Sequence, residues 1–383
     1  MAPGCGVRIR GVRAGVALAL GAWLAVGLCV ATAEEGEKAG ALPTRTLPRE
    51  NLLLCHDAQG EVQPVKSAAD WDQRKRETLA AVAAVLGAWP GDEKRVALEM
   101  QVEEELDAGT YLQRRITYRS EPDCRVPAYL LIPKAALVPK ARPFPAVLAL
   151  HPTHHLGPES ITKDGPNADR RYAHELAERG YVVLAPAYPL LGEYQPDLKK
   201  LGWESGLLKA VWDNVRGLDL LDSLPFVKTK RYVAIGHSLG GHNAVFTGVF
   251  DDRLHGVISS CGLDSFVDYY QGNPDVWQPE RGWTQTRYMP KLAGYRGRLN
   301  EIPFDFHELI ASLAPRSVLI VAPLEDDNFL AESVDRVAAA ARPVFALYDS
   351  SEKLHVEHPP GGHNFPPAMR EKSYLLIDSL LRD

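Results

Sequence analysis

The residues of this chain best suited to covalent chemistry lie around Ser238, in the segment Tyr232-Val-Ala-Ile-Gly-His-Ser-Leu-Gly-Gly241. A short apolar run precedes the serine, and a small-residue segment that can begin a helix follows it. Gly236 and Gly240 flank the serine at positions where a Cβ would collide in a sharp strand-to-helix turn. The pattern therefore predicts a nucleophile elbow, which exposes the serine Oγ above the edge of a sheet. A glycine-rich turn with no chemical role is the alternative.

A serine hydroxyl is a weak nucleophile near neutral pH, so it needs an imidazole to take its proton and a carboxylate to orient that imidazole. The apolar run Val318–Ala322 predicts a buried strand, and Glu325, Asp326 and Asp327 follow it. Sites in open α/β sheets collect at such strand ends. We expect Asp326 to be the acid. Asp327 is the alternative, unless it caps a helix that starts near residue 329 or the whole segment is only an acidic loop.

His363 is the candidate general base. It follows Gly361-Gly362 in a tight loop that comes after the last predicted strand and just before a predicted C-terminal helix over residues 368–381. A histidine in that position can reach the serine. His355 and His358 stand earlier, and we expect them to be polar loop residues.

The tetrahedral intermediate of such a reaction needs hydrogen-bond donors for its oxyanion. This geometry takes one from the backbone N–H after the nucleophile, here Leu239, and one from the loop after an early strand. That loop begins at His151. Pro152 has no N–H, so Thr153 is the expected donor, with His154 as the alternative. The histidines of this loop have no carboxylate or cysteine at ligand spacing, so we predict no metal and no other cofactor.

A chain that positions these residues must alternate strands and helices. From about residue 143, short apolar runs predict buried strands over residues 146–150, 181–185, 232–235, 256–260, 318–322 and 344–348. Such alternation predicts an α/β fold with a mostly parallel sheet and helices on both faces. Earlier runs predict a helix over residues 71–86 and then antiparallel strands over residues 96–105, 111–118 and 126–132.

One long insertion, residues 264–315, separates two of the predicted parallel strands and is rich in aromatic residues. Such a segment can form a cap over the site. We expect Trp277, Trp283 and Tyr288 to line a pocket for a sugar or a short acyl group, with His237 contributing from beside the serine. A cap core packed only on itself is the alternative.

The composition excludes several classes of protein. The chain has 383 residues, of which 45% are hydrophobic and 24% charged, and this is ordinary for a globular protein. Its formal net charge is −6, and no block of Lys and Arg offsets it. We therefore expect no nucleic-acid partner.

The N-terminus has the pattern of an export signal. Arg8, Arg10 and Arg13 precede an apolar run over residues 16–30, and Ala31-Thr-Ala33 follows it. We predict a signal peptide over residues 1–33 and a secreted or periplasmic protein with no membrane span after cleavage. A retained membrane anchor is the alternative. Residues 34–94 would form an N-terminal extension with the accessory helix, and residues 95–383 the main domain.

Cleavage after residue 33 would leave an odd set of cysteines, Cys55, Cys124 and Cys261. In an oxidising compartment one disulfide can form among them, and Cys55 with Cys124 is the pair that we favour; the sequence leaves open whether it forms. Cys261 lies in an apolar stretch, and we expect it to be a buried free thiol.

The serial arrangement of His151-Pro-Thr153, the elbow, Asp326 and Gly361-Gly-His363 resembles the α/β-hydrolase superfamily over about residues 95–383. The segments 125–133 and 322–329 are similar to a secreted bacterial esterase branch with dienelactone-hydrolase-like, acetyl-xylan-esterase-like and prolyl-oligopeptidase-like members. Lipases have His-Gly-Gly-Gly where this chain has His-Pro-Thr-His. True prolyl oligopeptidases carry a propeller domain, for which this chain has no room.

The resemblance implies a Ser-His-Asp serine hydrolase with Ser238, His363 and Asp326 at the matching positions. We expect it to cleave carboxylic esters through an acyl-enzyme, with a small-molecule or carbohydrate ester as substrate. A small serine peptidase is one alternative, because the same triad cleaves amides. A catalytically silent binding protein with this fold is the other.

Overall fold

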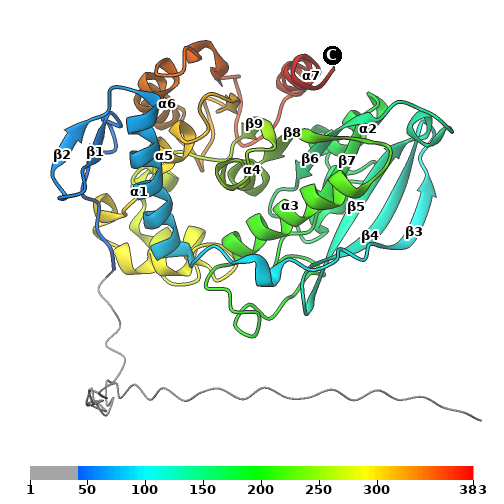
Figure 1. Cartoon of the computed structure of the whole chain (residues 1–383), viewed down its shortest axis with the longest axis horizontal. Coiled ribbons are helices and arrows are strands. Elements are labelled where there is room, and N and C mark those ends of the chain that lie inside the picture. The colour runs from blue at the N-terminus through cyan, green and yellow to red at the C-terminus, as the bar shows by residue number, and fades with distance from the viewer. Residues whose placement is uncertain (1–41, 383) are drawn as a thin grey trace, which may run out of the picture. The chain divides into compact units, whose positions relative to one another are not determined.

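Nine strands pair into one sheet in the order β11-β10-β9-β8-β6-β7-β5-β4-β3 in the computed structural model, which describes residues 42–382 (Figure 1). The neighbours from β11 to β7 pair in parallel, and β7, β5, β4 and β3 pair antiparallel. The bounds are β3 Gln101–Asp107, β4 Tyr111–Glu121, β5 Cys124–Pro133, β6 Phe144–Leu150, β7 Val182–Pro186, β8 Val227–His237, β9 Leu254–Ser260, β10 Ser317–Val321 and β11 Leu354–Glu357. This confirms the predicted α/β-hydrolase-type sheet.

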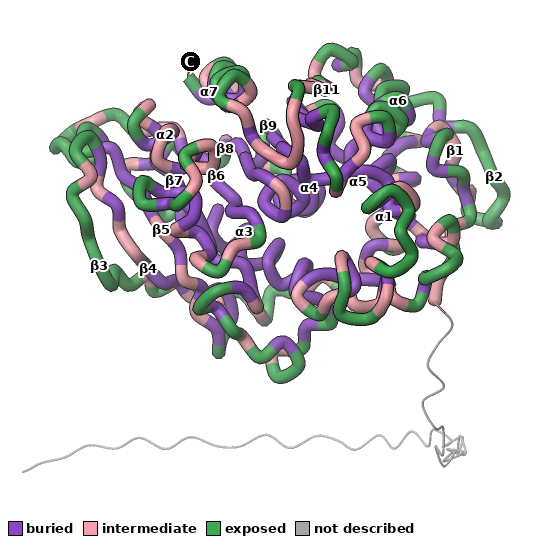
Figure 2. Tube along the Cα trace, turned by 180° about the vertical axis from the view of Figure 1, so that it is seen from behind, coloured by how far each residue is buried: buried purple, intermediate pink, exposed green. Residues whose placement is uncertain are grey.

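Helices cover both faces of the sheet. Alternate residues of a strand point to opposite faces, and in β6 Ala146 and Leu148 belong to one hydrophobic cluster while Val147 and Ala149 belong to the other. Buried side chains of α1, α3, α4, α5 and α6 belong to the first cluster, and buried side chains of α2 and α7 belong to the second. The middle strands are therefore buried along most of their length (Figure 2). The helices are α1 Ala68–Leu86, α2 Tyr172–Glu178, α3 Gly206–Ser223, α4 Leu239–Phe250, α5 Phe306–Ala311, α6 Ala331–Ala346 and α7 Pro367–Leu381.

The predicted strand over residues 344–348 is wrong. Val344 is in α6, because Val334, Val337 and Ala341 precede it at helical spacing and are buried on the same side of the helix. The last strand is β11, which pairs in parallel with β10 and includes His355, so that histidine is not in a loop. The loop of His363 still follows the last strand, as expected.

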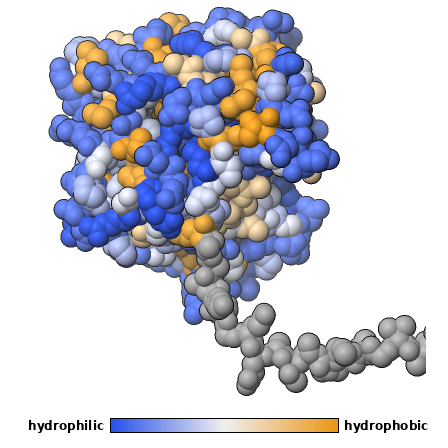
Figure 3. Space-filling view, turned by 90° about the vertical axis from the view of Figure 1, so that its left-hand side faces the viewer, coloured by the Kyte–Doolittle hydropathy of each residue, from blue (hydrophilic) through white to orange (hydrophobic). Residues whose placement is uncertain are grey.

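The insertion 264–315 folds into short 3₁₀ turns and α5, and the N-terminal extension packs on it. Two short strands of the extension, β1 Leu54–His56 and β2 Val62–Pro64, form a separate antiparallel pair. Buried ion pairs join the extension to α5: Arg49 to Asp305 at 2.5 Å and Arg74 to Glu308 at 3.0 Å. The outer surface on the side of β1 and β2 is mostly hydrophilic, with scattered hydrophobic side chains (Figure 3).

The predicted signal peptide lies outside the described residues. No helix within residues 42–382 is long and apolar enough to cross a membrane. Cys55 and Cys124 are free, so the possible disulfide is not formed, and the Cys124 Sγ instead lies 3.2 Å from the Tyr194 hydroxyl. Cys261 is a buried free thiol, as predicted.

Candidate active site

The chain turns sharply between β8 and α4 at Ser238, which has φ 55° and ψ −123°. Such a backbone is strained for a residue with a side chain. A Cβ on Gly236 would overlap the Gly240 backbone, and a Cβ on Gly240 would overlap the Leu150 carbonyl. Both positions therefore require glycine, and the segment has the geometry of a nucleophile elbow.

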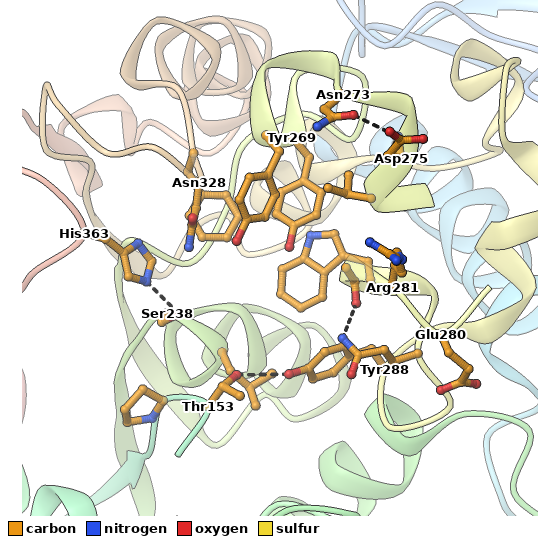
Figure 4. A pocket seen from close by; sticks show the side chains of 18 of the residues that line it. Thr153, Ser238, Tyr269, Asn273, Asp275, Glu280, Arg281, Tyr288, Asn328 and His363 are labelled. Atoms are coloured by element: carbon orange, nitrogen blue, oxygen red, sulfur yellow. Dashed lines mark hydrogen bonds between the residues drawn. The ribbon is translucent and has the colours of Figure 1, made fainter. Parts of the chain in front are cut away.

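Three of the predicted residues meet at this turn. The His363 Nε2 lies 2.8 Å from the Ser238 Oγ, and the His363 Nδ1 lies 2.9 Å from the Asp326 Oδ2 (Figure 4 shows His363 facing Ser238). With the Nδ1 proton donated to the carboxylate, Nε2 is free to accept the serine proton. The arrangement can perform nucleophilic attack assisted by a general base.

Asp326, not Asp327, faces the histidine. The Asp326 side chain is only 1% exposed, and its Oδ1 also accepts hydrogen bonds from the N–H groups of Asn328 and Phe329, at 2.8 and 3.3 Å. Asp327 is exposed. It does not cap α6 either, because that helix begins at residue 331 and its N-cap, Leu330, makes no side-chain cap bond.

Two residues with backbone N–H groups that are unpaired in the described part of the chain, Leu239 and Thr153, line the cavity at Ser238. Leu239 is the first residue of α4, so its N–H is among those that a helix leaves unpaired, at the positive end of the helix dipole. Thr153 lines the same cavity as Ser238, and its N–H has no backbone partner within residues 42–382. These are the two predicted donors.

His151 sets the loop that carries Thr153. Burial lowers the pKa of His151 to about 4, so its ring is neutral near pH 7. Its Nε2 accepts the Tyr188 N–H at 3.1 Å, which leaves Nδ1–H to donate to the Pro152 carbonyl at 2.8 Å. The ring thus joins its own loop to the segment that follows β7.

A cavity of about 970 Å³ opens above Ser238. One wall is aromatic, with Trp283 at its centre: its ring stacks on Tyr269 at 5.4 Å and meets Tyr288 edge-on at 5.2 Å. The remaining side chains are mostly polar, and those that the structure places on the lining include Arg170, Asn273, Asp275, Glu280, Arg281, Gln285 and Asn328.

The chain is similar in sequence to a family of esterases and to a named hydrolase. The family model "Glucuronyl esterase, fungi" matches residues 200–348. A 4-O-methyl-glucuronoyl methylesterase from Wolfiporia cocos is 26% identical over 234 residues, which are 57% of this chain and 54% of that protein, so the chain spans about half its length. The Bacillus subtilis protein YtaP, named as a hydrolase, is 25% identical over 269 residues, 67% of this chain and 84% of YtaP.

Solved structures show the fold. A glucuronoyl esterase from Solibacter usitatus superposes with a TM-score of 0.66 at 20% identity and covers 89% of this chain and 99% of its own. A CE15 glucuronoyl esterase from Teredinibacter turnerae has a TM-score of 0.66 at 19% identity, with 86% and 88% covered. The chain is a carboxylic ester hydrolase of the α/β-hydrolase fold.

Two residues that we predicted to line the pocket of this esterase, Trp277 and His237, do not line the cavity. Trp277 is fully buried and packs edge-on against Phe266 and Tyr269, so it belongs to the core of the cap. His237 is also fully buried, because the side chain next to an elbow serine points away from the cavity. Its Nδ1 lies 3.2 Å from the Ser260 Oγ, and burial together with the nearby His363 lowers its pKa well below the usual value.

Sequence reasoning missed Tyr269, Phe329, Arg281 and Arg170 as lining residues of the esterase cavity. Phe329 stands three residues after Asp326, and its aromatic side chain directly after the polar run 325–328 was a usable signal. Arg170 carries no such signal, because its loop reaches the site only through the tertiary fold.

Tyr288 links the cap to the loop of Thr153, since their hydroxyl groups lie 3.0 Å apart (Figure 4). The Tyr288 carbonyl accepts the Leu207 N–H at 3.2 Å, which fixes the tyrosine to α3. We expect Tyr288→Phe to lower kcat about 3- to 10-fold, the effect of one lost hydrogen bond, because Thr153 would lose its anchor. Steady-state kinetics on an aryl acetate should show KM nearly unchanged.

Tyr188 is a matched control, because its hydroxyl is buried without a hydrogen-bond partner within residues 42–382. Tyr188→Phe should leave kcat close to that of the native protein. The double variant Thr153→Val with Tyr288→Phe should lose no more kcat than either single variant, because both changes remove the same hydrogen bond. Equal losses of kcat in Tyr188→Phe and Tyr288→Phe would contradict a positioning role for Tyr288.

Proposed function

We propose that Ser238 is the nucleophile of this esterase, with His363 as the general base and Asp326 as the residue that orients and stabilises the imidazole. The observation that carries the proposal is the continuous chain of hydrogen bonds from the Ser238 Oγ through His363 to Asp326. His363 takes the serine proton as Oγ attacks the ester carbonyl. The N–H groups of Leu239 and Thr153 then stabilise the oxyanion of the tetrahedral intermediate.

His363 also carries the proton in the rest of the reaction, which completes acylation and then removes the acyl group. The intermediate expels the alcohol, which takes the proton from the imidazolium of His363, and an acyl-enzyme remains on Ser238. Water then loses a proton to His363 and attacks the acyl carbon. The imidazolium returns this proton to the serine as the serine leaves, and the released acid loses its own proton to solvent near pH 7.

The substrate that we propose is an ester of a glucuronic acid or a closely related uronic acid unit. The matching family model and the named methylesterase support this choice. The cavity is consistent with it: Trp283 and Tyr269 offer flat aromatic surface for a sugar ring, and Asn273 and Gln285 can bond its hydroxyl groups.

Methyl glucuronate should be hydrolysed with a kcat/KM at least about 10-fold above that of methyl acetate, because the ring adds binding contacts that the transition state also uses. Acid release followed in a pH-stat measures both rates. Trp283→Leu should remove most of the difference, whereas Trp283→Phe should keep part of it.

Thermal unfolding of each variant separates binding from packing, since Trp283 also stacks on His242 at 4.0 Å. A lower melting temperature with unchanged KM for both esters would show that Trp283 only packs the cap. Equal kcat/KM for the two esters in the native protein would exclude the uronic acid proposal.

We also propose that the protein acts outside the cytoplasm, with the signal peptide over residues 1–33 removed. The basic, apolar and Ala-x-Ala regions of its sequence support this. The proposed units are the extension 34–94 and the hydrolase domain 95–383 with its insertion 264–315. The ion pair of Arg45 with Glu308, at 2.5 Å, indicates that the extension steadies the insertion. N-terminal sequencing of exported protein tests the cleavage site.

A further inference from the structure

Arg170 is a cation beside the triad with no role in the mechanism above. It ends the 3₁₀ turn Ala168–Arg170 and lines the cavity together with Ser238 and His363. Its Nη2 makes one long hydrogen bond, 3.4 Å, to the His363 carbonyl, and its Nε is buried without a partner. No carboxylate within residues 42–382 forms an ion pair with it.

The turn that carries Arg170 is held against the histidine loop on its other side. The neighbouring Asp169 accepts a hydrogen bond from the Asn364 Nδ2 at 2.9 Å and pairs with Arg370 at 3.2 Å. Arg370 also donates to the Phe365 carbonyl at 2.8 Å. Asp169 is therefore engaged elsewhere, and Arg170 is left facing the cavity.

The other charges of the cavity do not neutralise Arg170. Arg281 comes from the opposite wall, and Figure 4 shows it between Asp275 and Glu280. Asp275 lies 3.6 Å from Arg296, and Glu280 accepts hydrogen bonds from Thr286. Asp275 and Glu280 thus lie on the cap side near Arg281, whereas Arg170, on the side of Ser238, has no ion pair with a carboxylate within residues 42–382.

A partly buried cation without an ion-pair partner is costly, and a ligand that brings negative charge lowers the cost. The guanidinium group has the planar fork that binds a carboxylate through two hydrogen bonds. We propose that Arg170 binds a carboxylate in the substrate cavity. The source is either a free carboxylate that an anionic ester carries beside its scissile group, as a partly esterified polyuronate does, or the carboxylate that hydrolysis releases.

Turnover of matched esters distinguishes the two sources and rests on the proposed function. Monomethyl and dimethyl glutarate differ by one free carboxylate. If the substrate brings it, kcat/KM for the monoester exceeds that for the diester, and Arg170→Gln lowers the ratio about 10-fold or more. If the product brings it, the ratio stays near one, and Arg170→Gln instead raises the inhibition constant of acetate or glucuronate by a similar factor.

Arg171→Gln is the matched control, because Arg171 donates to the Gly165 carbonyl at 2.7 Å and does not line the cavity. It should leave both quantities unchanged. The inference would be overturned if Arg170→Gln had the same ester ratio and the same inhibition constant as the native protein.

Binding without turnover keeps this test separate from the proposed function. Calorimetry on Ser238→Ala protein, with glutarate and acetate as ligands, should show binding that Arg170→Gln abolishes. Such binding, together with a native protein that hydrolyses no ester, would overturn the proposed function and support the role of Arg170. Ester hydrolysis by the native protein, together with carboxylate binding that does not depend on Arg170, would support the proposed function and overturn the role of Arg170.

Discussion

Replacing Ser238 by alanine should lower kcat for ester hydrolysis by about 10⁴-fold or more, because no other group takes over the covalent step once the Oγ is absent. Removal of the hydroxyl leaves the Ser238 N–H bond to the Ser260 carbonyl, at 2.7 Å, intact, so the elbow should fold normally. Steady-state kinetics on an aryl acetate measures the loss. Reaction with a fluorophosphonate probe, mapped by mass spectrometry, should label Ser238 in the native protein and nothing in the variant.

Histidine variants provide the matched comparison. His363→Gln should abolish labelling, because the Ser238 Oγ then lacks its base. His358→Gln should not, since His358 bonds the Ala322 carbonyl at 2.7 Å and Asp335 at 3.0 Å, outside the cavity. Normal labelling of His363→Gln, or native turnover by Ser238→Ala, would remove the triad from the mechanism.

Replacing Asp326 by asparagine should lower kcat by about 10⁴-fold, the loss expected when a buried amide replaces the acid of a triad. The carboxylate holds the proton on the His363 Nδ1 and stabilises the imidazolium that forms as the serine attacks. An amide can keep the hydrogen bonds from the N–H groups of Asn328 and Phe329, so the loop should keep its conformation. Kinetics with circular dichroism as a folding check measures the effect.

Asp327→Asn makes the same chemical change one residue further along. Asp327 is exposed and makes no contact with His363, so its kcat should stay within about twofold of the native value, as for most surface substitutions. A large loss in Asp327→Asn and a small one in Asp326→Asn would reverse the assignment of the acid.

Local sequence signals were sufficient for the elbow and for the order of the candidate triad. The glycines at 236 and 240 are required by contacts within a few residues of Ser238 and with the adjacent strand, and such short-range requirements appear directly in the sequence. Asp326 and His363 were predictable because both follow strands of a parallel sheet, whose carboxyl ends gather at one edge.

The sequence by itself thus determined the fold class, the serine turn and the residues that can complete a triad. Only the tertiary structure decided which side chains face the cavity. Residues 344–348 have the composition of a strand, but residues 344–346 form the end of α6, because the helical spacing of its apolar residues buries Val344 and Phe345. Trp277 and Trp283 both belong to the same aromatic-rich insertion, yet packing within the cap buries Trp277 completely, whereas Trp283, at 5% exposure, lines the cavity. Arg170 reaches the triad through long-range contacts, which no local pattern encodes.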